Sequence, residues 1–184
     1  MATYTVDLFT TLDGFGTGPV AYWGKDGPEL REWHARTFFA AANQTLVFGA
    51  NTYRMMARFA AQFEDDPNFA SLSAARKIVI SRTLEEPLTW ANSTLIAEDA
   101  LLAVPRLKAE SPVPLRSHGS IAMNRALLAA GLVDRLNVMV FPVITGVSGK
   151  NPILVGLPDI DLELVDSRLF DGRVQQLVYI PTVR

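Results

Sequence analysis

Short alternating or apolar segments, separated by amphipathic ones, set the pattern of this chain. Residues 4–12, YTVDLFTTL, alternate and are rich in β-branched and aromatic residues, which predicts a first strand. Similar runs predict further strands at 45–49, 77–81, 93–97, 113–117 and 134–144. Helices are predicted between them at 28–42, 50–61, 99–109 and 121–131. Pro28 is an early residue of the first, Pro105 interrupts the third, and the last ends at Gly131.

Strands separated by helices of this length imply parallel, right-handed crossovers and a sheet that is covered on both faces. The end of the chain differs, because residues 160–170 and 173–183 both alternate and are joined by Asp171-Gly172, a strong hairpin signal. We therefore predict a single α/β domain over residues 1–184. It has three layers and a mixed, mostly parallel sheet that ends in an antiparallel hairpin. The glycine-rich residues 13–27 are predicted to form a long loop.

In open α/β sheets, ligands bind outside the carboxyl ends of the parallel strands. Here those ends are Thr10-Thr11, Phe48-Gly49, Ser81-Arg82, Ser117-His118 and Pro142, and three of them run into a glycine or a small hydroxyl residue just before a helix. Helix N-termini offer unpaired N–H groups and a partial positive charge, so the segment His118-Gly119-Ser120 favours a phosphate or the amide end of a nucleotide.

Plainer interpretations of the same segment stay open. Ser120 is also the residue type that caps a helix entry, and a lone His118 is typical of a hydrogen-bonded structural histidine. A nucleophilic serine is disfavoured, because the G-x-S-x-G turn of serine hydrolases is absent. The glycines at 14, 16 and 18 are followed by a loop instead of a helix, so they do not fit a Rossmann fingerprint.

Composition narrows the chemistry. The chain has no cysteine and two histidines, which excludes thiolate chemistry and disfavours a metal site. Its formal net charge is −2 and its basic residues are scattered, so neither nucleic acid nor a membrane surface is an expected partner. No signal peptide or apolar run of about 20 residues is visible, and a cytoplasmic protein is expected.

Several motifs in a fixed order resemble one family along nearly the whole chain. They are TLDGF, VFGANTY, KIVISRTL, HGSIAMNRALLAAGLVDRLNVMVFPVITG and DSRLFDG. The chain thus resembles the dihydrofolate reductase-like superfamily and, within it, the reductase domain (RibD C-terminal domain) of bifunctional riboflavin-biosynthesis enzymes. The resemblance implies a mixed sheet of about eight strands, NADPH as hydride donor and a homodimer. The zinc-deaminase motifs of the bifunctional enzymes are absent.

The resemblance also implies site residues. Gly49 and Thr52 match residues that meet the cofactor's pyrophosphate, and Gly119, Ser120 and Ile121 match the turn under the pyrophosphate and the nicotinamide ribose. Ser81 and Arg82 match the region that holds the adenosine ribose and its 2′-phosphate. Asp13 and Gly14 match the loop beside the nicotinamide. Folate reductases carry a basic residue where this chain has Ala50, which leaves Arg82 or Arg54 to supply charge, and they carry a glycine where it has His118.

The expected function is an NADPH-dependent reductase, most similar to 5-amino-6-(5-phosphoribosylamino)uracil reductase. A pterin or other imine or carbonyl reductase, and a non-catalytic nucleotide-binding dimer module, are the alternatives. The candidate catalytic residues are His118, Glu29 and Asp13, with Glu32 one turn beyond Glu29. Lys150 is a candidate for binding a substrate phosphate, and Trp23 and Trp33 are expected to flank the cleft.

Overall fold

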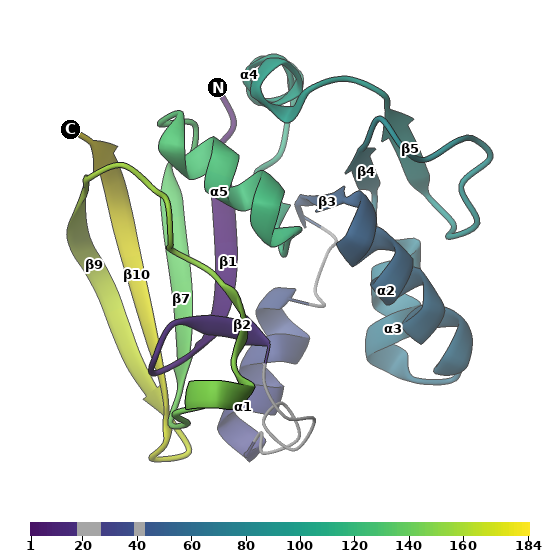
Figure 1. Ribbon diagram of the computed structural model, residues 1–184. Helices are drawn as coiled ribbons and strands as arrows, with labels where there is room; N and C mark the ends of the chain where they lie inside the picture. Colours follow the sequence, from purple (N-terminus) through teal and green to yellow (C-terminus); the bar gives the residue numbers. More distant parts are fainter. Residues whose placement is uncertain (18–26, 39–42) are drawn as a thin grey trace.

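The computed structural model describes residues 1–17, 27–38 and 43–184 (Figure 1). Its strands are β1 (Tyr4–Thr11), β2 (Phe15–Thr17), β3 (Thr45–Gly49), β4 (Lys77–Ile80), β5 (Ser93–Ile96), β6 (Leu115–Ser117), β7 (Arg135–Phe141), β8 (Lys150–Pro152), β9 (Ile160–Phe170) and β10 (Val174–Val183). Its helices are α1 (Pro28–Trp33), α2 (Ala50–Gln62), α3 (Pro67–Ala74), α4 (Ala100–Glu110) and α5 (Ile121–Ala129). A π-helical turn, η2 (His34–Phe38), follows α1, and a 3₁₀ turn, η4 (Gly146–Ser148), precedes β8.

The described strands form one eight-stranded sheet in the order β5-β4-β3-β6-β1-β7-β10-β9, and β2 pairs with β8 in a separate ribbon. The strands from β5 to β7 are parallel, whereas β10 is antiparallel to β7 and β9 is antiparallel to β10. The hairpin turn is at Asp171-Gly172, where both residues have positive φ angles. This arrangement confirms the predicted fold class, a mostly parallel sheet with a C-terminal antiparallel hairpin.

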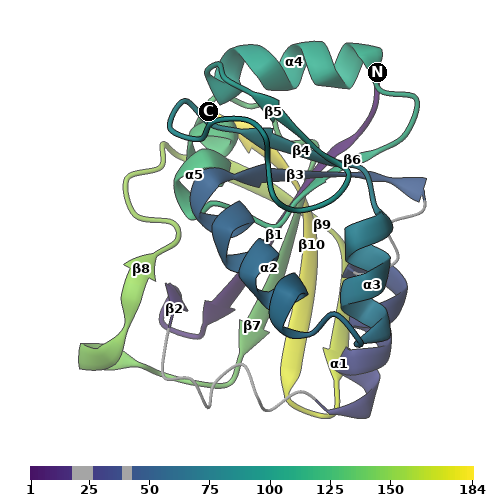
Figure 2. The ribbon, with the colours of Figure 1, turned by 90° about the vertical axis from the view of Figure 1, so that its right-hand side faces the viewer.

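Helices cover both faces of the sheet and bury its apolar side chains. On one face, β1, β6 and β7 pack against α4 and α5, through residues such as Val6, Leu127 and Leu136. On the other face, α2 and α3 pack over β3 and β4, and α1 packs over the ends of β7, β9 and β10. Figures 1 and 2 show α5 and α1 on opposite sides of β1 and β7, which gives the three layers.

The predicted interruption at Pro105 is wrong, because α4 continues through it. Pro105 removes only the hydrogen bond to the carbonyl of Leu101, and both residues are exposed, so water can satisfy that oxygen. The helix predicted over 28–42 consists of α1 followed by η2, and residues 39–42 lie outside the described part. The loop predicted over 13–27 contains β2, and its residues 18–26 also lie outside that part.

Candidate functional site

Two helix starts meet at the carboxyl ends of β3 and β6. The amide of Gly49, just before α2, donates to the carbonyl of Gly119, just before α5, at 3.0 Å. A Cβ on Gly49 would lie 2.6 Å from Ser120 Oγ, and one on Gly119, whose φ is +129°, would lie 2.6 Å from Thr52 Oγ1. The structure therefore brings together four of the residues proposed to hold the cofactor. We call residues 49–52 and 119–121 the rim.

The rim presents main-chain amides. Gly49 occupies the N-cap of α2 and offers no side chain to the first N–H groups of that helix. At α5, Ser120 caps the helix by accepting from the Met123 amide at 3.4 Å. Ile121, the first residue of α5, lies against the β2 ribbon, since a Cβ on Gly16 would be 2.7 Å from its Cδ1. Such a surface of amides at helix N-termini favours an anion.

Ser81 and Arg82 extend the same edge of the sheet. Gly49 is paired in register with Ile80, the last residue of β4, so Ser81 and Arg82 follow directly beside the start of α2. Ser81 Oγ accepts from the amides of Thr83 and Leu84, at 3.1 and 3.2 Å, which shapes the turn, and Arg82 is exposed.

Hydrogen bonds hold the loop after β1 against the loop after β7. The Asp13 carboxylate accepts from the amides of Thr145 and Gly146, at 3.0 and 2.8 Å. The Thr11 hydroxyl, followed by these amides, lowers the pKa of Asp13 to about 2. Gly14 has a φ of +87° in the same turn. Asp13 is therefore ionised at neutral pH and already used as an acceptor.

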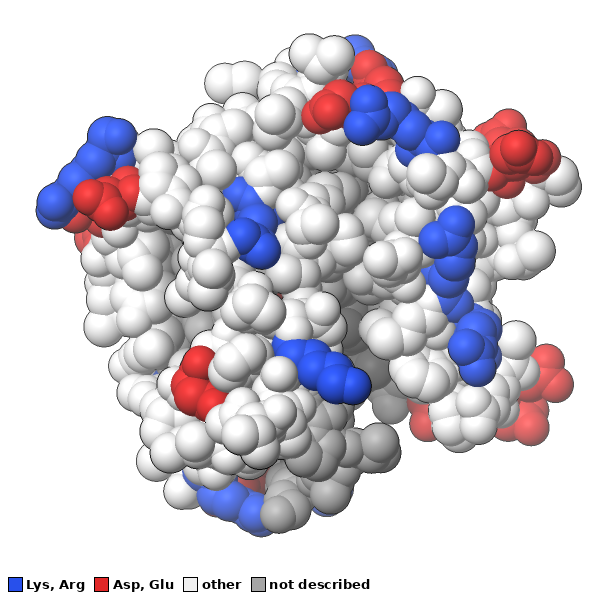
Figure 3. Space-filling view, viewed as in Figure 1, with Lys and Arg blue, Asp and Glu red and all other residues white. Residues whose placement is uncertain are grey.

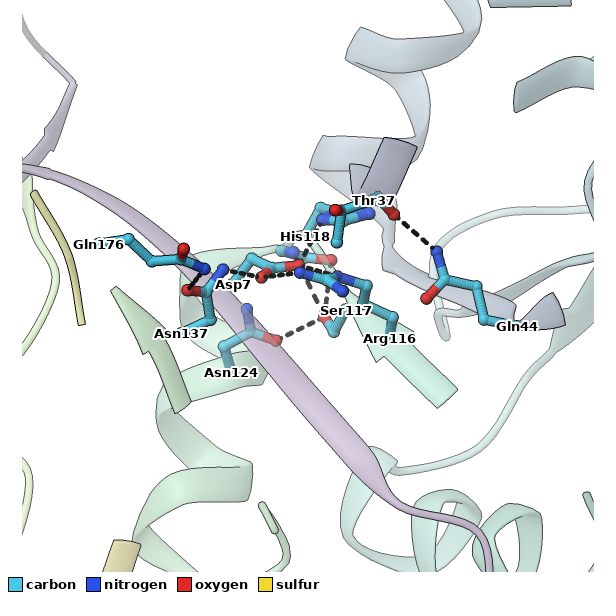
Figure 4. A network of polar contacts seen from close by, with 10 residues as sticks. Asp7, Thr37, Gln44, Arg116, Ser117, His118, Asn124, Asn137 and Gln176 are labelled. Carbon is cyan, nitrogen blue, oxygen red and sulfur yellow. Dashed lines mark hydrogen bonds and ion pairs between the residues drawn. The ribbon is translucent and has the colours of Figure 1, made fainter. Parts of the chain in front are cut away.

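A buried polar network lies beneath the rim on the α1 side of the sheet (Figure 4). Its centre is Asp7 of β1, whose carboxylate receives two hydrogen bonds from Arg116, at 2.6 and 2.7 Å, and one from Asn137, at 2.6 Å. Burial by itself would raise the pKa of Asp7, but Arg116 and His118 outweigh it and hold that pKa well below its ordinary value. Gln176 then donates to Asn137 at 2.8 Å.

His118 belongs to this network instead of facing outward. Its side chain is 2% exposed, and its Nδ1 lies 2.9 Å from Asp7 Oδ2. Burial lowers the pKa of His118, against the opposing effect of Asp7. His34 of η2 is also affected: burial, and then the charge of His118, lower its pKa to about 4. His118 thus links the network directly to Gly119 of the rim.

Asp7, Arg116, Asn137 and Gln176 are not among the residues predicted from the sequence. The one local signal for Asp7 is a carboxylate in the middle of an otherwise apolar strand, which indicates a paired or functional group. Its partners lie 109 and 130 residues away in the sequence, so no local pattern connects them.

The remaining candidates lie farther from the rim. Glu29 is exposed, and its Oε2 accepts from the amide of Asp171 in the β9–β10 turn at 2.6 Å. Glu32 pairs with Arg36 at 2.6 Å. Lys150 is exposed on β8. Trp33, the last residue of α1, is 9% exposed, whereas Trp23 is outside the described residues.

Charges on the described residues are dispersed over the face shown in Figure 3. Within the part of the chain that the structure describes, no helix is long and apolar enough to span a membrane. In the same residues, no group of three acidic, histidine or cysteine side chains is arranged to hold a metal ion.

The chain was compared with protein families and with solved structures. The model of the RibD C-terminal domain matches residues 2–176. A putative riboflavin biosynthesis protein from Shewanella sp. PV-4 superimposes with a TM-score of 0.77 at 18% identity, over 98% of this chain and 99% of that one. A pyrimidine reductase-like protein from Corynebacterium diphtheriae gives a TM-score of 0.67 at 13% identity, over 100% and 93%. A search of curated proteins gave no match.

A third similar structure comes from Thermotoga maritima and is a diaminohydroxyphosphoribosylaminopyrimidine deaminase/5-amino-6-(5-phosphoribosylamino)uracil reductase. It has a TM-score of 0.67 at 14% identity, and the match covers 98% of this chain but 57% of that one. These structures share the fold, and the family model covers nearly all of the sequence. This chain belongs to the RibD C-terminal domain family.

Proposed function

We propose that this protein is an NADPH-dependent reductase that binds the dinucleotide pyrophosphate on the rim. The observation that carries the proposal is the contact between the starts of α2 and α5, where Gly49 and Gly119 are 3.0 Å apart from N to O. Each glycine lets the other helix start pack closely, because a Cβ at Gly49 would meet Ser120 Oγ and one at Gly119 would meet Thr52 Oγ1. The N-termini of α2 and α5 therefore lie side by side, an arrangement that favours an anionic phosphate. The residues present therefore fit the phosphates of a dinucleotide.

The other residues follow from their positions along the same edge. Ser81 and Arg82, beside the start of α2, are proposed to hold the adenosine ribose and its 2′-phosphate. The loop at Asp13 and Gly14 is proposed to lie beside the nicotinamide. When bound, NADPH supplies a hydride to a C=N or C=O group of the substrate. The chain contributes orientation of the two reactants and exclusion of water.

The three catalytic candidates receive different roles in this proposal. Asp13 is ionised and fixed by backbone amides, so it positions its loop. His118 is buried against Asp7, so it positions Gly119. Glu29 has an exposed carboxylate that accepts a hydrogen bond from the Asp171 amide. We propose that Glu29 relays a proton from water to the reduced substrate.

Family membership supports a phosphoribosylaminopyrimidine as substrate, since the Thermotoga maritima relative is named for that reaction. Incubating the protein with NADPH and 5-amino-6-(5-phosphoribosylamino)uracil should give loss of the dihydronicotinamide absorbance, and dihydrofolate serves as the comparison substrate. Faster oxidation with dihydrofolate would contradict this assignment.

The cofactor site itself is tested by Gly49→Ala. Gly49 has a φ of −83°, so alanine is not strained there, and its Cβ would crowd Ser120 Oγ. We expect NADPH affinity to fall at least tenfold by titration calorimetry. Arg58→Ala, an exposed substitution further along α2, is the control. Equal NADPH affinity in Gly49→Ala and the control would overturn the placement.

We also propose that the protein is a homodimer in which a second copy covers the outer strand β9. This edge strand is 11 residues long and exposed over most of its length, and Leu162 and Leu164 are 47% and 53% exposed. Long apolar edge strands in native proteins are normally covered. Leu164→Lys should convert a dimer into a monomer in analytical ultracentrifugation. A monomeric unmodified protein would contradict the proposal.

A further inference from the structure

The turn between β6 and α5 is held from both faces of the sheet. Successive side chains of a strand point to opposite faces. His118 accordingly faces Asp7 on the α1 side, while Ser117 meets Asn124 of α5 on the other side (Figure 4). Gly119 of the rim follows directly, so contacts on both faces act on this one residue.

The Ser117 hydroxyl both donates and accepts a hydrogen bond. It donates to Asn124 Oδ1 at 2.7 Å and accepts from the Gly119 amide at 3.3 Å. Ser117 and Asn124 are both 0% exposed. Because a hydroxyl carries a single hydrogen, the bond to Asn124 leaves only the lone pairs of Ser117 to face the turn.

The Ser117 hydrogen has a second acceptor within reach, the Gly119 carbonyl at 3.5 Å. The same carbonyl accepts from the Gly49 amide at 3.0 Å, which is the contact between the starts of α2 and α5. With Asn124 in place, the Ser117 hydrogen is directed away and the Gly119 oxygen is left to Gly49. Without Asn124, that hydrogen would turn to the Gly119 oxygen and draw it toward Ser117.

Ser117 also determines how Gly119 takes part in the rim. The Gly119 amide donates inward to Ser117, and its φ of +129° is a conformation that residues with a side chain rarely adopt. Gly119 therefore contributes its carbonyl and its shape to the rim. The amides left for an anion are the other ones at the starts of the two helices.

Asn124 is a poor choice for its surroundings if stability alone is considered. It is buried on α5 beside apolar residues such as Met123 and Leu128. Its Nδ2 is buried with no hydrogen-bond partner among the described residues. A buried donor without an acceptor lowers the free energy of unfolding. This disadvantage indicates that Asn124 serves the turn through its Oδ1 instead of serving the core.

We propose that Asn124 is a positioning residue for the rim. By accepting the Ser117 hydrogen, it holds Gly119 in the conformation in which the starts of α2 and α5 meet. Asn124 touches no ligand, because it is buried on the α5 side of the sheet. The proposal rests on the dinucleotide site proposed above.

The first test compares Asn124→Ala with Val133→Ala. Val133 is buried and precedes β7, at the edge of the sheet opposite the rim, so its truncation lowers stability without touching the turn. Asn124→Ala should weaken NADPH binding about fivefold in titration calorimetry, the effect of one hydrogen bond. Val133→Ala should leave NADPH affinity unchanged.

A double-mutant cycle tests the route through Ser117. Ser117→Ala alone should also weaken NADPH binding. Adding Asn124→Ala to it should have no further effect, because Asn124 acts only through the Ser117 hydroxyl. Ser117→Thr, which keeps a hydroxyl, should restore most of the affinity.

NMR spectra of the free protein report on the turn without NADPH. Asn124→Ala should shift the amide proton signals of Gly49 and Gly119, because their hydrogen bonds change, and Val133→Ala should leave both in place. Unchanged signals and unchanged affinity in Asn124→Ala would overturn the proposal. Additive losses in the cycle, or an equal loss in Val133→Ala, would also overturn it. If the unmodified protein does not bind NADPH, the cofactor proposal fails, and the two amide signals still decide whether Asn124 holds the turn.

Discussion

The loss of stability between pH 6.5 and pH 4 should depend strongly on His34. In the folded protein, burial and the nearby His118 lower the pKa of His34 from 6.5 to about 4. The unfolded chain therefore binds a proton near pH 6.5 that the folded chain does not bind until pH 4. Stability from this residue is complete above pH 6.5 and is lost as the pH falls toward 4.

The size of the effect follows from the shift. The pKa of His34 differs by about 2.5 between the unfolded and folded states. At about 1.4 kcal/mol per pH unit, the total loss of stability, reached below pH 4, is about 3 kcal/mol. At pH 5, where the unfolded state is nearly fully protonated at His34 and the folded state is not, the loss is about 2 kcal/mol.

The measurement is urea unfolding of the unmodified protein and of His34→Phe at pH 7.5 and pH 5. Phenylalanine keeps a ring beside Phe9 and Trp33, whose centroids are 5.9 and 5.4 Å from that of His34. The carboxylates titrate in both proteins and cancel in the difference. Relative to the unmodified protein, the variant should gain about 2 kcal/mol of stability between the two pH values. Parallel pH profiles would refute the reasoning.

Three further substitutions test the buried network at Asp7 and the proposed roles of Arg82 and Asp13. Asp7→Asn removes the charge that faces Arg116 and should lower the free energy of unfolding by about 3 kcal/mol in urea. Asp161→Asn, in an exposed ion pair, should change that free energy little. Equal effects of the two substitutions would contradict the buried role of Asp7. Arg82→Ala should weaken NADPH about tenfold in calorimetry and leave NADH unchanged, and a matched loss for both would remove Arg82 from the 2′-phosphate. Asp13→Asn should lower kcat without shifting the pH profile between pH 5 and pH 8, because the pKa of Asp13 is about 2; a shifted profile would make Asp13 a proton donor.

Much of the fold follows from local pattern. The segment TLVFG forms β3 over the predicted residues, and Asp171-Gly172 forms the hairpin turn between β9 and β10. The expectation that strand ends share one edge also places Gly49 beside Gly119. These features are predictable because periodicity and turn chemistry are encoded within a few residues.

Other features depend on contacts that a local pattern does not contain. The short strands β2 and β8 pair across residues 17 and 150, and each is too brief to show alternation. Helix α3 was not predicted from the spacing of apolar residues, although Asp66-Pro67 is a typical helix start. The hydrogen bonds to Asp7 come from Arg116 and Asn137, which only the folded sheet brings to β1.

The central claim, that the rim binds a dinucleotide, is tested most directly by following the backbone amides in NMR spectra during titration with NADPH. The largest changes should fall on residues 49–52 and 119–121, with smaller ones at Ser81 and Arg82. Changes confined to other parts of the chain, or none at saturating NADPH, would contradict the claim.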